Sequence, residues 1–557
     1  MGKDFTLTES RKNAVRSKTK SPTARFRLLS TAAGTTEAGG SSSSSSSSSK
    51  GLAIALGAAV LGFGSYYAGS RKDASVSTAA AVPVYGTQED FKRAIKEMVD
   101  TLAEGVVSVD PANLSTHGFS PNVMHAGVAH SVVVYPNSTE DVVKIVKIAN
   151  KYRMPVIPYA GGTSLEGHFI GHEGGGICID MSNMNQILEI HPGDSDMVVQ
   201  SGVDWMEINS TLKDNGIPLF FPIDPGPSAT IGGMLSTGCS GTNAVRYGTA
   251  KGEWFLNATV VLPSGEVIKT RQRARKSSAG FDVTKLFIGA EGTLGIVTEV
   301  TVRLAPVIPS QVAIAQFPSV KQATEAVIEI LNTGVNIQCI ELLDAAFMHA
   351  TNVSGATGNK YDVADHLFFK LQGVTPAAID DGARIVQQVV QKHGGSKFKR
   401  AKTQEEGDLI WQDRKNALFT ALAYAGGDAK GWLTDVCVPI SNLPKLIEET
   451  QRDIEAHDIK YLTAGHAGDG NFHSLLTFRN EEELKTVREL VHRMVERAIR
   501  LDGTCTGEHG VGIGKKEFLI EELGEGTVNL MKTIKRAVDP LWLFNPGKLY
   551  PDGKSSH

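Results

Sequence analysis

Apolar and polar residues near the start of the folded part of the chain predict helices and short strands in turn. Residues 91–105 carry apolar side chains at helical spacing, and Gly105 ends that pattern. The segment 130–167 then predicts a strand, a helix, a second strand and a glycine-rich loop. Ser138 or Thr139, followed by two acidic residues, suits the start of this helix. The second strand leads directly into the loop AGGTSLEG.

Two more stretches rich in Gly, Ser and Thr lie at 223–249 and 285–306, and the later one leads into a strand of alternating apolar residues. Between them, residues 254–270 predict a β-hairpin with Pro-Ser-Gly at its turn. A single loop of this kind is also typical of a plain turn, and the first loop has neither the Walker motif nor the GxGxxG spacing. Three such loops together predict a site where backbone N–H groups line one long ligand.

The pattern changes after Pro309, where strand-like and helical segments alternate up to residue 458. This alternation predicts an antiparallel sheet covered by helices, and hence an α+β fold class for the chain. The strand-like segments are 311–319 and 367–374, the helical segments are 320–334 and 377–395, and 433–458 continues the series.

A chain of 557 residues is too long for a single core, which predicts two or three globular units. Hydrophobic residues make up 41% and charged residues 21%, as in ordinary folded proteins. The net charge of −4 gives no reason to expect a nucleic-acid partner. Five scattered cysteines without CxxC spacing indicate single thiols rather than a disulfide framework or a zinc ribbon.

The charge is distributed unevenly, with a net of +6 over residues 1–50 and −10 over the rest. Residues 11–30 are rich in Arg, Lys and Ser and contain no acid, which is typical of a mitochondrial presequence. Asp4 and Glu9 depart from that composition, and a disordered basic tail is the alternative. The nine consecutive serines Ser41–Ser49 predict a flexible tether.

Residues 51–69 contain no charged residue and are flanked by Lys50 and by Arg71 and Lys72. As a helix, this segment would span roughly 28 Å, enough for a bilayer core. A presequence followed by such a segment predicts an anchor in the inner mitochondrial membrane, with the folded part facing the intermembrane space. Cleavage of the segment, or its packing against the fold, is the alternative.

Two glycine-rich stretches in the second half of the chain carry candidate chemistry. AGHAGDGNFH holds His466 and His473 around a turn-forming run, and GTCTGEHGVGIGK holds Glu508 beside His509. Two imidazoles and a carboxylate are usual ligands of Zn²⁺ or Mn²⁺, with positions left open for substrate. The stretches therefore indicate either a metal site next to a base or two tight turns with structural histidines.

Three motifs resemble the FAD-binding domain of the vanillyl-alcohol oxidase superfamily: PYAGGTSLEGH, DPG…ATIGGMLSTGCSGTNAVRYG and GAEGTLGIVTE. The resemblance runs from about residue 80 to the C-terminus. It is closest to the D-2-hydroxyacid dehydrogenase branch, which includes the D-lactate dehydrogenases (cytochrome), and implies a two-part FAD-binding domain with an antiparallel-sheet cap domain. The expected divisions are 1–50 (presequence and tether), 51–70 (anchor), 80–306 (FAD binding), 307–525 (cap with metal site) and 526–557 (return to the FAD-binding domain).

The resemblance implies that FAD lies along the three glycine-rich stretches. The first loop would wrap the diphosphate, and Ile296 and Val297 would lie by the isoalloxazine, with Asn545 and Lys548 near it. Ala160 precedes the glycines of the first loop, so we expect FAD to be bound without the His or Cys tether of some relatives. The implied FAD-binding residues are Pro158, Gly161, Gly162, Thr163, Ser164, Asp224, Thr230, Gly233, Ser240, Asn243, Glu291, Gly295, Ile296, Val297, Asn545 and Lys548.

The resemblance further implies that His466, His473 and Glu508 bind a divalent metal ion, Zn²⁺ or Mn²⁺. His509 would be the base next to the flavin. Asn471 would donate a hydrogen bond to substrate or flavin.

Arg414 lies in a helix-like run whose apolar residues between 409 and 422 share one face. The residues alone allow a surface arginine paired with Glu405 or Asp408. The resemblance instead implies that Arg414 binds the substrate carboxylate, because its planar donors suit two oxygens at once.

The activity that the resemblance implies is the FAD-dependent oxidation of D-lactate to pyruvate, with electrons passed to cytochrome c. Another D-2-hydroxy acid, D-2-hydroxyglutarate or glycolate, is the nearest alternative substrate. A metal-dependent hydrolase is an alternative of another class, but it leaves the three glycine-rich loops unexplained. A flavin-binding membrane scaffold without activity is a third alternative, against which the intact GEHG motif argues.

Overall fold

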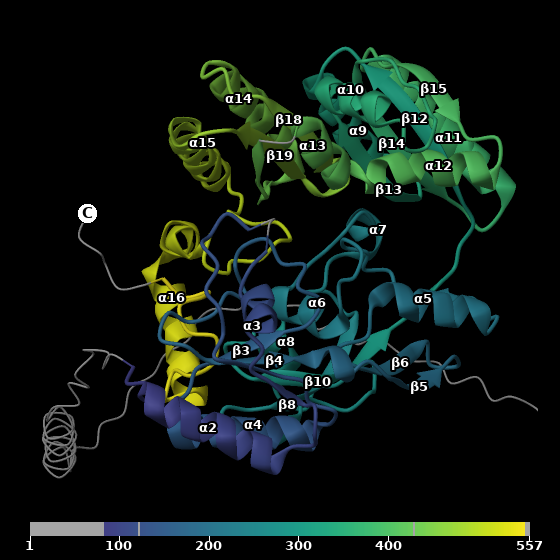
Figure 1. Ribbon diagram of the computed structural model, residues 1–557. Coiled ribbons are helices and arrows are strands. Elements are labelled where there is room, and N and C mark those ends of the chain that lie inside the picture. The colour runs from purple at the N-terminus through teal and green to yellow at the C-terminus, as the bar shows by residue number, and fades with distance from the viewer. Residues whose placement is uncertain (1–82, 121–122, 427–428, 552–557) are drawn as a thin grey trace, which may run out of the picture. The chain divides into compact units, whose positions relative to one another are not determined.

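A computed structural model describes residues 83–120, 123–426 and 429–551 (Figure 1). The chain separates into two units, Met1–Ala81 and Val82–His557, and the described residues belong to the second unit. The predicted presequence, tether and membrane anchor therefore lie outside the described residues. Among the helices of the described part, none combines the length and hydropathy needed to span a membrane.

The first described helix, α2 (Gln88–Thr101), starts and ends earlier than the helix predicted at 91–105. The Thr87 hydroxyl accepts a hydrogen bond from the Asp90 N–H, and the Asp90 carboxylate accepts one from the Thr87 N–H. This capping box adds a polar first turn, which apolar spacing cannot reveal. At the other end, the backbone becomes extended at Leu102, and the helix stops there.

The first sheet comprises β1 (Val107–Ser108), β2 (Val132–Val134), β3 (Val156–Tyr159) and β4 (Ile177–Asp180), and α3 (Pro111–His117) and α4 (Thr139–Tyr152) accompany it. The strand order is β1–β2–β4–β3, and β2, β4 and β3 run parallel. The predicted strand–helix–strand order is confirmed. Ser138 caps α4 by accepting a hydrogen bond from the Asp141 N–H. Figure 1 shows α4 beside α2, and both helices bury apolar residues in one core with this sheet.

The second sheet comprises β5 (Ile187–His191), β6 (Asp196–Gln200), β8 (Phe255–Val261), β9 (Val267–Lys269) and β10 (Ile296–Arg303). Its strands are antiparallel in the order β5–β6–β10–β8–β9. The predicted hairpin is β8 and β9, and the predicted alternating strand is β10. Further elements here are β7 (Leu219–Phe220), β11 (Ala305–Pro306), α5 (Trp205–Asp214), α6 (Ile231–Thr237), α7 (Ala244–Tyr247) and α8 (Thr284–Phe287).

The third sheet is antiparallel, as the sequence predicted, with the order β15–β12–β14–β13–β18–β19–β16 and with β17 paired to β19. The strands are β12 (Ser310–Phe317), β13 (Ile337–Leu343), β14 (Asp365–Gln372), β15 (Ser396–Arg400), β16 (Lys430–Leu433), β17 (Val436–Cys437), β18 (Tyr461–His466) and β19 (Asn471–Phe478).

Helices cover both faces of the third sheet. One face shares a core with α9 (Val320–Asn332), α11 (Pro376–Lys392), α14 (Leu443–Glu455) and α15 (Glu481–Arg500). The other face shares a core with α10 (Ala345–Ser354), α12 (Gln404–Lys415) and α13 (Ala417–Ala425). The second group of helices matters for the site, because α12 carries Arg414.

The helix-like run around Arg414 forms two helices that meet at Asn416. Its predicted apolar face is wrong, because Leu409 is 41% exposed and Phe419 is 59% exposed, whereas Trp411 and Arg414 are buried. Asn416 has a φ of −80° and a ψ of 5°, so the regular helical geometry is interrupted there. Residues before and after the break therefore do not share a face, and the spacing of apolar residues across it has no meaning.

The last helix is α16 (Leu519–Val538), which is interrupted at Gly524. The residues that follow it return to the first sheet. The Val156 N–H donates to the Leu543 carbonyl, and the Asn545 N–H donates to the Val156 carbonyl. Leu543 and Phe544 are fully buried in the core of that sheet. The domain boundaries expected from the sequence stay predictions.

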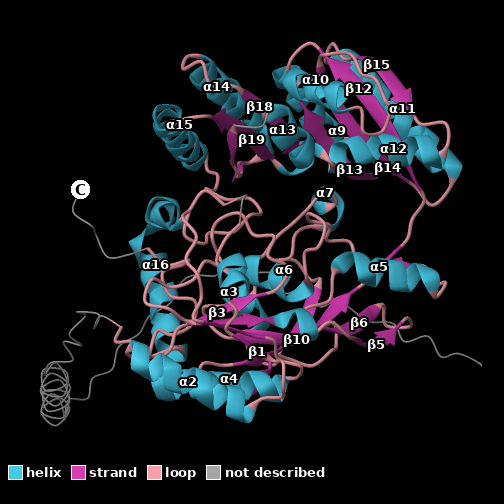
Figure 2. Cartoon of the chain, viewed as in Figure 1, coloured by secondary structure: helices cyan, strands magenta, loops and turns pink. Residues whose placement is uncertain are grey.

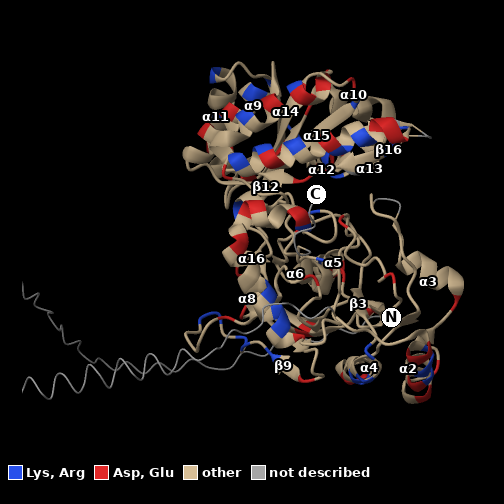
Figure 3. Cartoon of the chain, turned by 90° about the vertical axis from the view of Figure 1, so that its left-hand side faces the viewer, with Lys and Arg blue, Asp and Glu red and all other residues tan. Residues whose placement is uncertain are grey.

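Loops rather than regular elements surround α3, α6 and α7 on the side that faces β18 and β19 (Figure 2). Charged residues gather on the outer helices such as α2, α15 and α16, whereas the loops around α6 carry few of them (Figure 3). The weakly charged loops and the third sheet together enclose the candidate site.

Candidate active site

A cavity of about 830 Å³ lies between the loops of the first two sheets and the third sheet with α12 and α13. Most of the predicted FAD-binding residues line it, and so do Arg414, His509 and the three predicted metal ligands. The predicted FAD-binding residues that line it are Pro158, Gly161, Gly162, Thr163, Ser164, Asp224, Thr230, Gly233, Glu291, Gly295, Ile296, Val297 and Asn545.

Three predicted FAD-binding residues, Ser240, Asn243 and Lys548, are not part of the cavity lining formed by the described residues. The Asn243 N–H donates to Asp224 Oδ1 at 2.9 Å, behind the wall. The Lys548 ammonium donates to the Ile170 carbonyl at 2.6 Å, and burial lowers the pKa of Lys548 to about 7. These two hydrogen bonds join Asn243 and Lys548 to neighbouring protein groups, so they are not directed into the cavity.

The first glycine-rich loop packs so closely that side chains would not fit. A Cβ atom on Gly161 would lie 2.3 Å from the Ser228 carbonyl oxygen, and one on Gly162 would lie 2.3 Å from the Tyr159 hydroxyl. Gly162 also has a φ of +63°, which side chains disfavour. Backbone therefore forms this part of the wall, as a diphosphate-binding loop requires.

Two buried polar atoms on the cavity wall lack a hydrogen-bond partner within the described part of the chain. Thr230 Oγ1 and Asn545 Oδ1 have no hydrogen-bond partner among the described residues, although both side chains line the cavity. Buried polar atoms are nearly always satisfied in folded proteins. A long ligand rich in hydroxyl and phosphate oxygens, such as FAD, would satisfy them, so these residues fit the cofactor.

Glu291 ties the third glycine-rich stretch to the GEHG segment. Its carboxylate accepts from the Val511 N–H at 2.6 Å and from the Gly512 N–H at 2.9 Å. His168 Nε2 lies 3.1 Å from the same carboxylate. Glu291 thus aligns two cavity walls that are far apart in the sequence.

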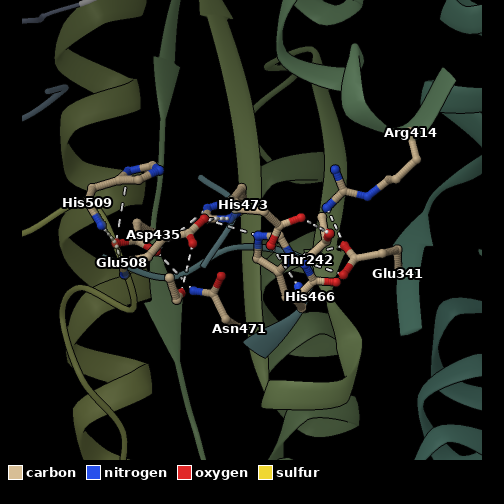
Figure 4. A network of polar contacts seen from close by, with 12 residues as sticks. Thr242, Glu341, Arg414, Asp435, His466, Asn471, His473, Glu508 and His509 are labelled. Carbon is tan, nitrogen blue, oxygen red and sulfur yellow. Dashed lines mark hydrogen bonds and ion pairs between the residues drawn. The ribbon is translucent and has the colours of Figure 1, made fainter. Parts of the chain in front are cut away.

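The predicted metal ligands converge in the structure. His466 ends β18 and His473 lies in β19, and the turn between them contains the short helix η3 (Ala467–Asp469). Glu508 Oε1 lies 3.1 Å from His466 Nε2 and 3.2 Å from His473 Nε2 (Figure 4). The ligand atoms of the three residues all lie within 4.8 Å of one another.

The outer partners of both imidazoles direct their Nε2 atoms towards Glu508. His473 Nδ1 donates to the Thr434 carbonyl at 3.0 Å, and His466 Nδ1 lies 2.9 Å from Glu341 Oε2. With the protons on Nδ1, two Nε2 lone pairs and a carboxylate face one another, which is a donor set that fits a divalent cation. Burial favours the neutral His466 ring, but Glu341 and Glu508 raise the pKa of His466 well above its usual value. The carboxylates of Glu341 and Glu508 therefore favour a positive charge at His466.

Asp435, a residue that the sequence analysis missed, organises the segment with Glu508 and His509. Its Oδ2 atom accepts from the Glu508 N–H at 2.9 Å, the His509 N–H at 2.8 Å and the Thr506 hydroxyl at 2.7 Å. Asp435 is fully buried. Burial opposes its charge, but His509 and His473 lower the pKa of Asp435 far below its usual value. Glu508 and His509 are thus held by an ionised carboxylate.

His509 is placed to exchange a proton. Its ring stacks on that of His473, with the centroids 5.0 Å apart and the planes at 9°. His509 Nδ1 is buried and has no hydrogen-bond partner among residues in the described ranges, and Asp435 Oδ2 is 3.9 Å away. Burial lowers the pKa of His509, although Asp435 raises it. A neutral imidazole with an unused nitrogen can act as a base.

Arg414 is buried and pairs with Glu341, so the expected alternative of a surface arginine paired with Glu405 or Asp408 is wrong. Arg414 Nη2 donates to Glu341 Oε2 at 2.5 Å (Figure 4). Arg414 Nε is buried and lacks a partner in the part of the chain that the structure describes. Since Arg414 lines the cavity, it keeps donors for an anionic ligand.

Glu341 is a second residue that the sequence analysis missed. It is 1% exposed and contacts both Arg414 and His466. A glutamate between apolar residues of β13 was the only signal for it in the sequence, and such a residue is equally compatible with a structural ion pair. Glu341 joins the candidate substrate-binding arginine to a candidate metal ligand.

Asn471 does not line the cavity formed by the described residues, although the sequence analysis expected a contact with substrate or flavin. Its Nδ2 atom donates to Asp435 Oδ1 at 2.9 Å and to the Val436 carbonyl at 3.0 Å. Asn471 therefore acts on the site through Asp435.

Comparisons with known proteins agree with this arrangement. A model for an FAD binding domain matches residues 130–271, and a model for the C-terminal domain of FAD linked oxidases matches residues 309–549. The chain is 43% identical to a protein of Arabidopsis thaliana named D-lactate dehydrogenase [cytochrome], mitochondrial, over 83% of this chain and 81% of that protein. It is 42% identical to D-lactate dehydrogenase [cytochrome] 1, mitochondrial, of Saccharomyces cerevisiae, over 83% of this chain and 79% of that protein.

The chain thus belongs to the family of FAD-linked oxidases that includes these two relatives. Among solved structures, 4-ethylphenol oxidase from Gulosibacter chungangensis has the same fold, with a TM-score of 0.70 at 20% identity. That match covers 85% of this chain and 99% of the other. The predicted α+β fold, with an FAD-binding domain of the vanillyl-alcohol oxidase type and an antiparallel-sheet domain, is confirmed.

Proposed function

We propose that the protein oxidises D-lactate to pyruvate with FAD as the hydride acceptor and cytochrome c as the final electron acceptor. One observation carries the proposal: Arg414, the cluster of His466, His473 and Glu508, and the base His509 line one cavity with the FAD-binding loops. The similarity to two D-lactate dehydrogenases over about four fifths of the chain supports the choice of substrate.

FAD is held without a covalent bond along the three glycine-rich stretches. Gly161 and Gly162 provide backbone for its diphosphate, and Thr230 and Asn545 provide polar atoms for the rest of the molecule. When bound there, FAD would supply the hydride acceptor for the reaction. Ala160 offers no side chain that could tether the flavin.

His466, His473 and Glu508 hold a divalent metal ion, Zn²⁺ or Mn²⁺. These three side chains would supply three of its ligands, and all three residues line the cavity. When bound, the ion acts as a Lewis acid that makes the substrate hydroxyl more acidic.

The protein side chains bind the acid, orient it and accept its proton. Arg414 binds the carboxylate through its free donors, while Glu341 holds the guanidinium plane. His509, which lines the cavity, accepts the hydroxyl proton on its imidazole ring. Asp435 fixes the backbone of His509 and favours the positive charge that the ring gains. Arg414, Glu341 and Asp435 are buried, which limits the access of water to the reacting atoms.

The location that we propose is the mitochondrial inner membrane, with the folded part in the intermembrane space. The basic segment 11–30 and the uncharged segment 51–69 support it, as do the names of the mitochondrial relatives. In that compartment, cytochrome c can reach the reduced enzyme.

Anaerobic mixing of the yellow holoenzyme with a panel of D- and L-2-hydroxy acids tests the function. We expect D-lactate to bleach the flavin, L-lactate to leave it oxidised, and the bleached enzyme to reduce ferric cytochrome c. If D-2-hydroxyglutarate or glycolate bleached the flavin faster than D-lactate, that acid would replace D-lactate as the proposed substrate. A colourless protein that hydrolyses esters or amides would replace it with the metal hydrolase.

A further inference from the structure

Buried lysine ammonium groups in this protein normally have an oxygen partner. Lys535 donates to Asp539 at 2.6 Å, Lys548 donates to a backbone carbonyl at 2.6 Å, and Lys515 lies 3.8 Å from Glu166. Such partners are expected, because an unpaired ammonium loses its hydration when it is buried.

Lys370 departs from this rule. Its side chain comes from β14, is largely withdrawn from solvent and lines the cavity. Its ammonium lies 4.2 Å from the centroid of the Trp411 ring, and no hydrogen bond or ion pair joins it to any described residue. Burial lowers the pKa of Lys370, although Cys339 and Asp224 at longer range raise it. A cation with only an aromatic face behind it is open to an anion on the cavity side.

Lys370 lies close to the candidate acid-binding group. It pairs directly with Cys339 across β13 and β14, and Glu341 lies two residues further along β13 on the same face of the sheet. On α12, Trp411 lies three residues before Arg414 and therefore on the same helix face. The contacts Arg414–Glu341 and Lys370–Trp411 thus both join α12 to the sheet. The two residues that make them on α12, Trp411 and Arg414, are about one helical turn, roughly 5 Å, apart along the helix axis.

We propose that Lys370, backed by Trp411, is a second anion subsite of the cavity, which binds the far carboxylate of a dicarboxylic acid whose near carboxylate is bound by Arg414. The spacing of about one helical turn suits the two ends of a four-carbon dicarboxylate. The inference rests on the proposed role of Arg414 in binding a carboxylate, and it extends the ligand class from monocarboxylic to dicarboxylic acids. The FAD diphosphate is the other source of anionic oxygen in the same cavity.

Difference spectra of the oxidised flavin in the holoenzyme test the subsite through binding alone. The probes are succinate and propionate, which share one carboxylate and differ by the second. We expect Lys370→Met to raise the dissociation constant of succinate roughly tenfold or more, the usual scale for loss of a charge-assisted hydrogen bond. The dissociation constant of propionate should change less than twofold. Lys370→Arg, which keeps the cation, should restore most of the succinate affinity.

The matched control is Lys415→Met, which removes the same charge from an exposed lysine of the same cavity lining. It should leave the ratio of the two dissociation constants within twofold of the wild-type value. FAD retention after gel filtration is measured on every variant. Loss of FAD from Lys370→Met with an unchanged succinate-to-propionate ratio would assign the anion to the diphosphate of the cofactor.

The subsite is excluded if Lys370→Met matches Lys415→Met in both the ratio and FAD retention. If Lys370→Met does not fold, Lys370→Gln and Lys370→Arg replace it, and equal ratios for these two variants also exclude the subsite. Failure of the proposed function is recognised separately, because wild-type flavin would then resist bleaching by D-lactate whatever the ratio of the two binding constants.

Discussion

Two walls of the cavity are built in different ways. The loop wall, residues 158–164, 224–233 and 291–297, consists largely of backbone from three short stretches of chain. The side-chain wall consists of single side chains from separate elements, namely Arg414, His466, His473, Glu508 and His509, and Glu341 and Asp435 hold these residues from behind. The loop wall binds by shape and backbone dipoles, so it tolerates little change in glycine. The side-chain wall works through charge, so each of its residues has its own chemical role.

The largest expected effect comes from removing the proposed base of the side-chain wall, which should impair proton transfer and leave binding intact. His509→Ala should lower turnover of D-lactate by roughly 10²-fold or more, the usual scale for a positioned base. The loop wall is untouched, so FAD should stay bound, and the metal content should not change because His509 is not a proposed ligand. Turnover, the flavin spectrum and metal analysis of one preparation check this. Loss of metal from this variant would reverse the roles that we assign to His473 and His509.

His473→Ala should remove the metal ion and retain FAD. Two remaining ligands hold a divalent ion poorly, whereas the FAD loops come from other elements. Metal analysis after dialysis against a chelator, with the ratio of absorbance at 450 and 280 nm as the flavin readout, checks this. His349→Ala is a suitable control, since His349 is in α10 and contacts Tyr424 rather than the cluster. A variant at His473 that keeps full metal and activity would mean that the histidines are structural.

Glu341→Gln should weaken metal binding by roughly 10- to 100-fold, the usual cost of losing an outer partner of a metal ligand. The same change should raise KM for D-lactate more than it lowers kcat, because Glu341 also holds Arg414. The metal dissociation constant and the two kinetic constants are measured on one set of samples. A purely structural role would lower thermal stability and leave both the metal affinity and KM unchanged.

Gly162→Ala should damage the loop wall alone, with roughly a tenfold loss of FAD affinity. The substituted residue would keep a φ of +63° and place its Cβ 2.3 Å from the Tyr159 hydroxyl; the left-handed conformation alone costs about 1–2 kcal/mol. Gly334→Ala controls for that strain, since Gly334 has a φ of +75° and no described atom within 4 Å of its Cβ position. If both variants retain FAD equally, close packing of the first loop does not matter for the cofactor.

The smallest expected effect is on how the free energy of unfolding depends on pH, through the buried His130. Burial lowers the pKa of His130 to about 4 from an ordinary value of 6.5. The unfolded chain therefore binds more protons between these pH values, and stability is full above about 6.5 and falls as the pH drops towards 4. Urea unfolding of wild type and His130→Gln at pH 7 and pH 5 checks this. The loss between the two pH values should be smaller in the variant, and an equal loss would contradict the assignment.

The loop wall could be predicted because its information is local in the sequence. The three glycine-rich stretches each follow or precede a strand, and most of their predicted residues line the cavity. Ser240, Asn243 and Lys548 were expected there too, but they bond to other protein groups: the Ser240 hydroxyl donates to Glu508, the Asn243 N–H donates to Asp224 and the Lys548 ammonium donates to the Ile170 carbonyl. A motif predicts where the backbone runs, whereas the direction of a side chain depends on what packs against it.

The sequence by itself determined the α+β class, the antiparallel third sheet and the glycine-rich loops, since each rests on periodicity or on adjacent residues. The members of the histidine cluster followed from the resemblance to a known family. Only the tertiary structure decided that Glu341 joins Arg414 to His466, that Asp435 holds the GEHG segment, and that Lys370 lines the cavity without an ion-pair partner among the described residues. These contacts join strands and helices whose order in the sheet does not follow their order in the chain. Spacing along the chain contains no information about such contacts, because sheet register and helix docking are settled by packing over the whole core.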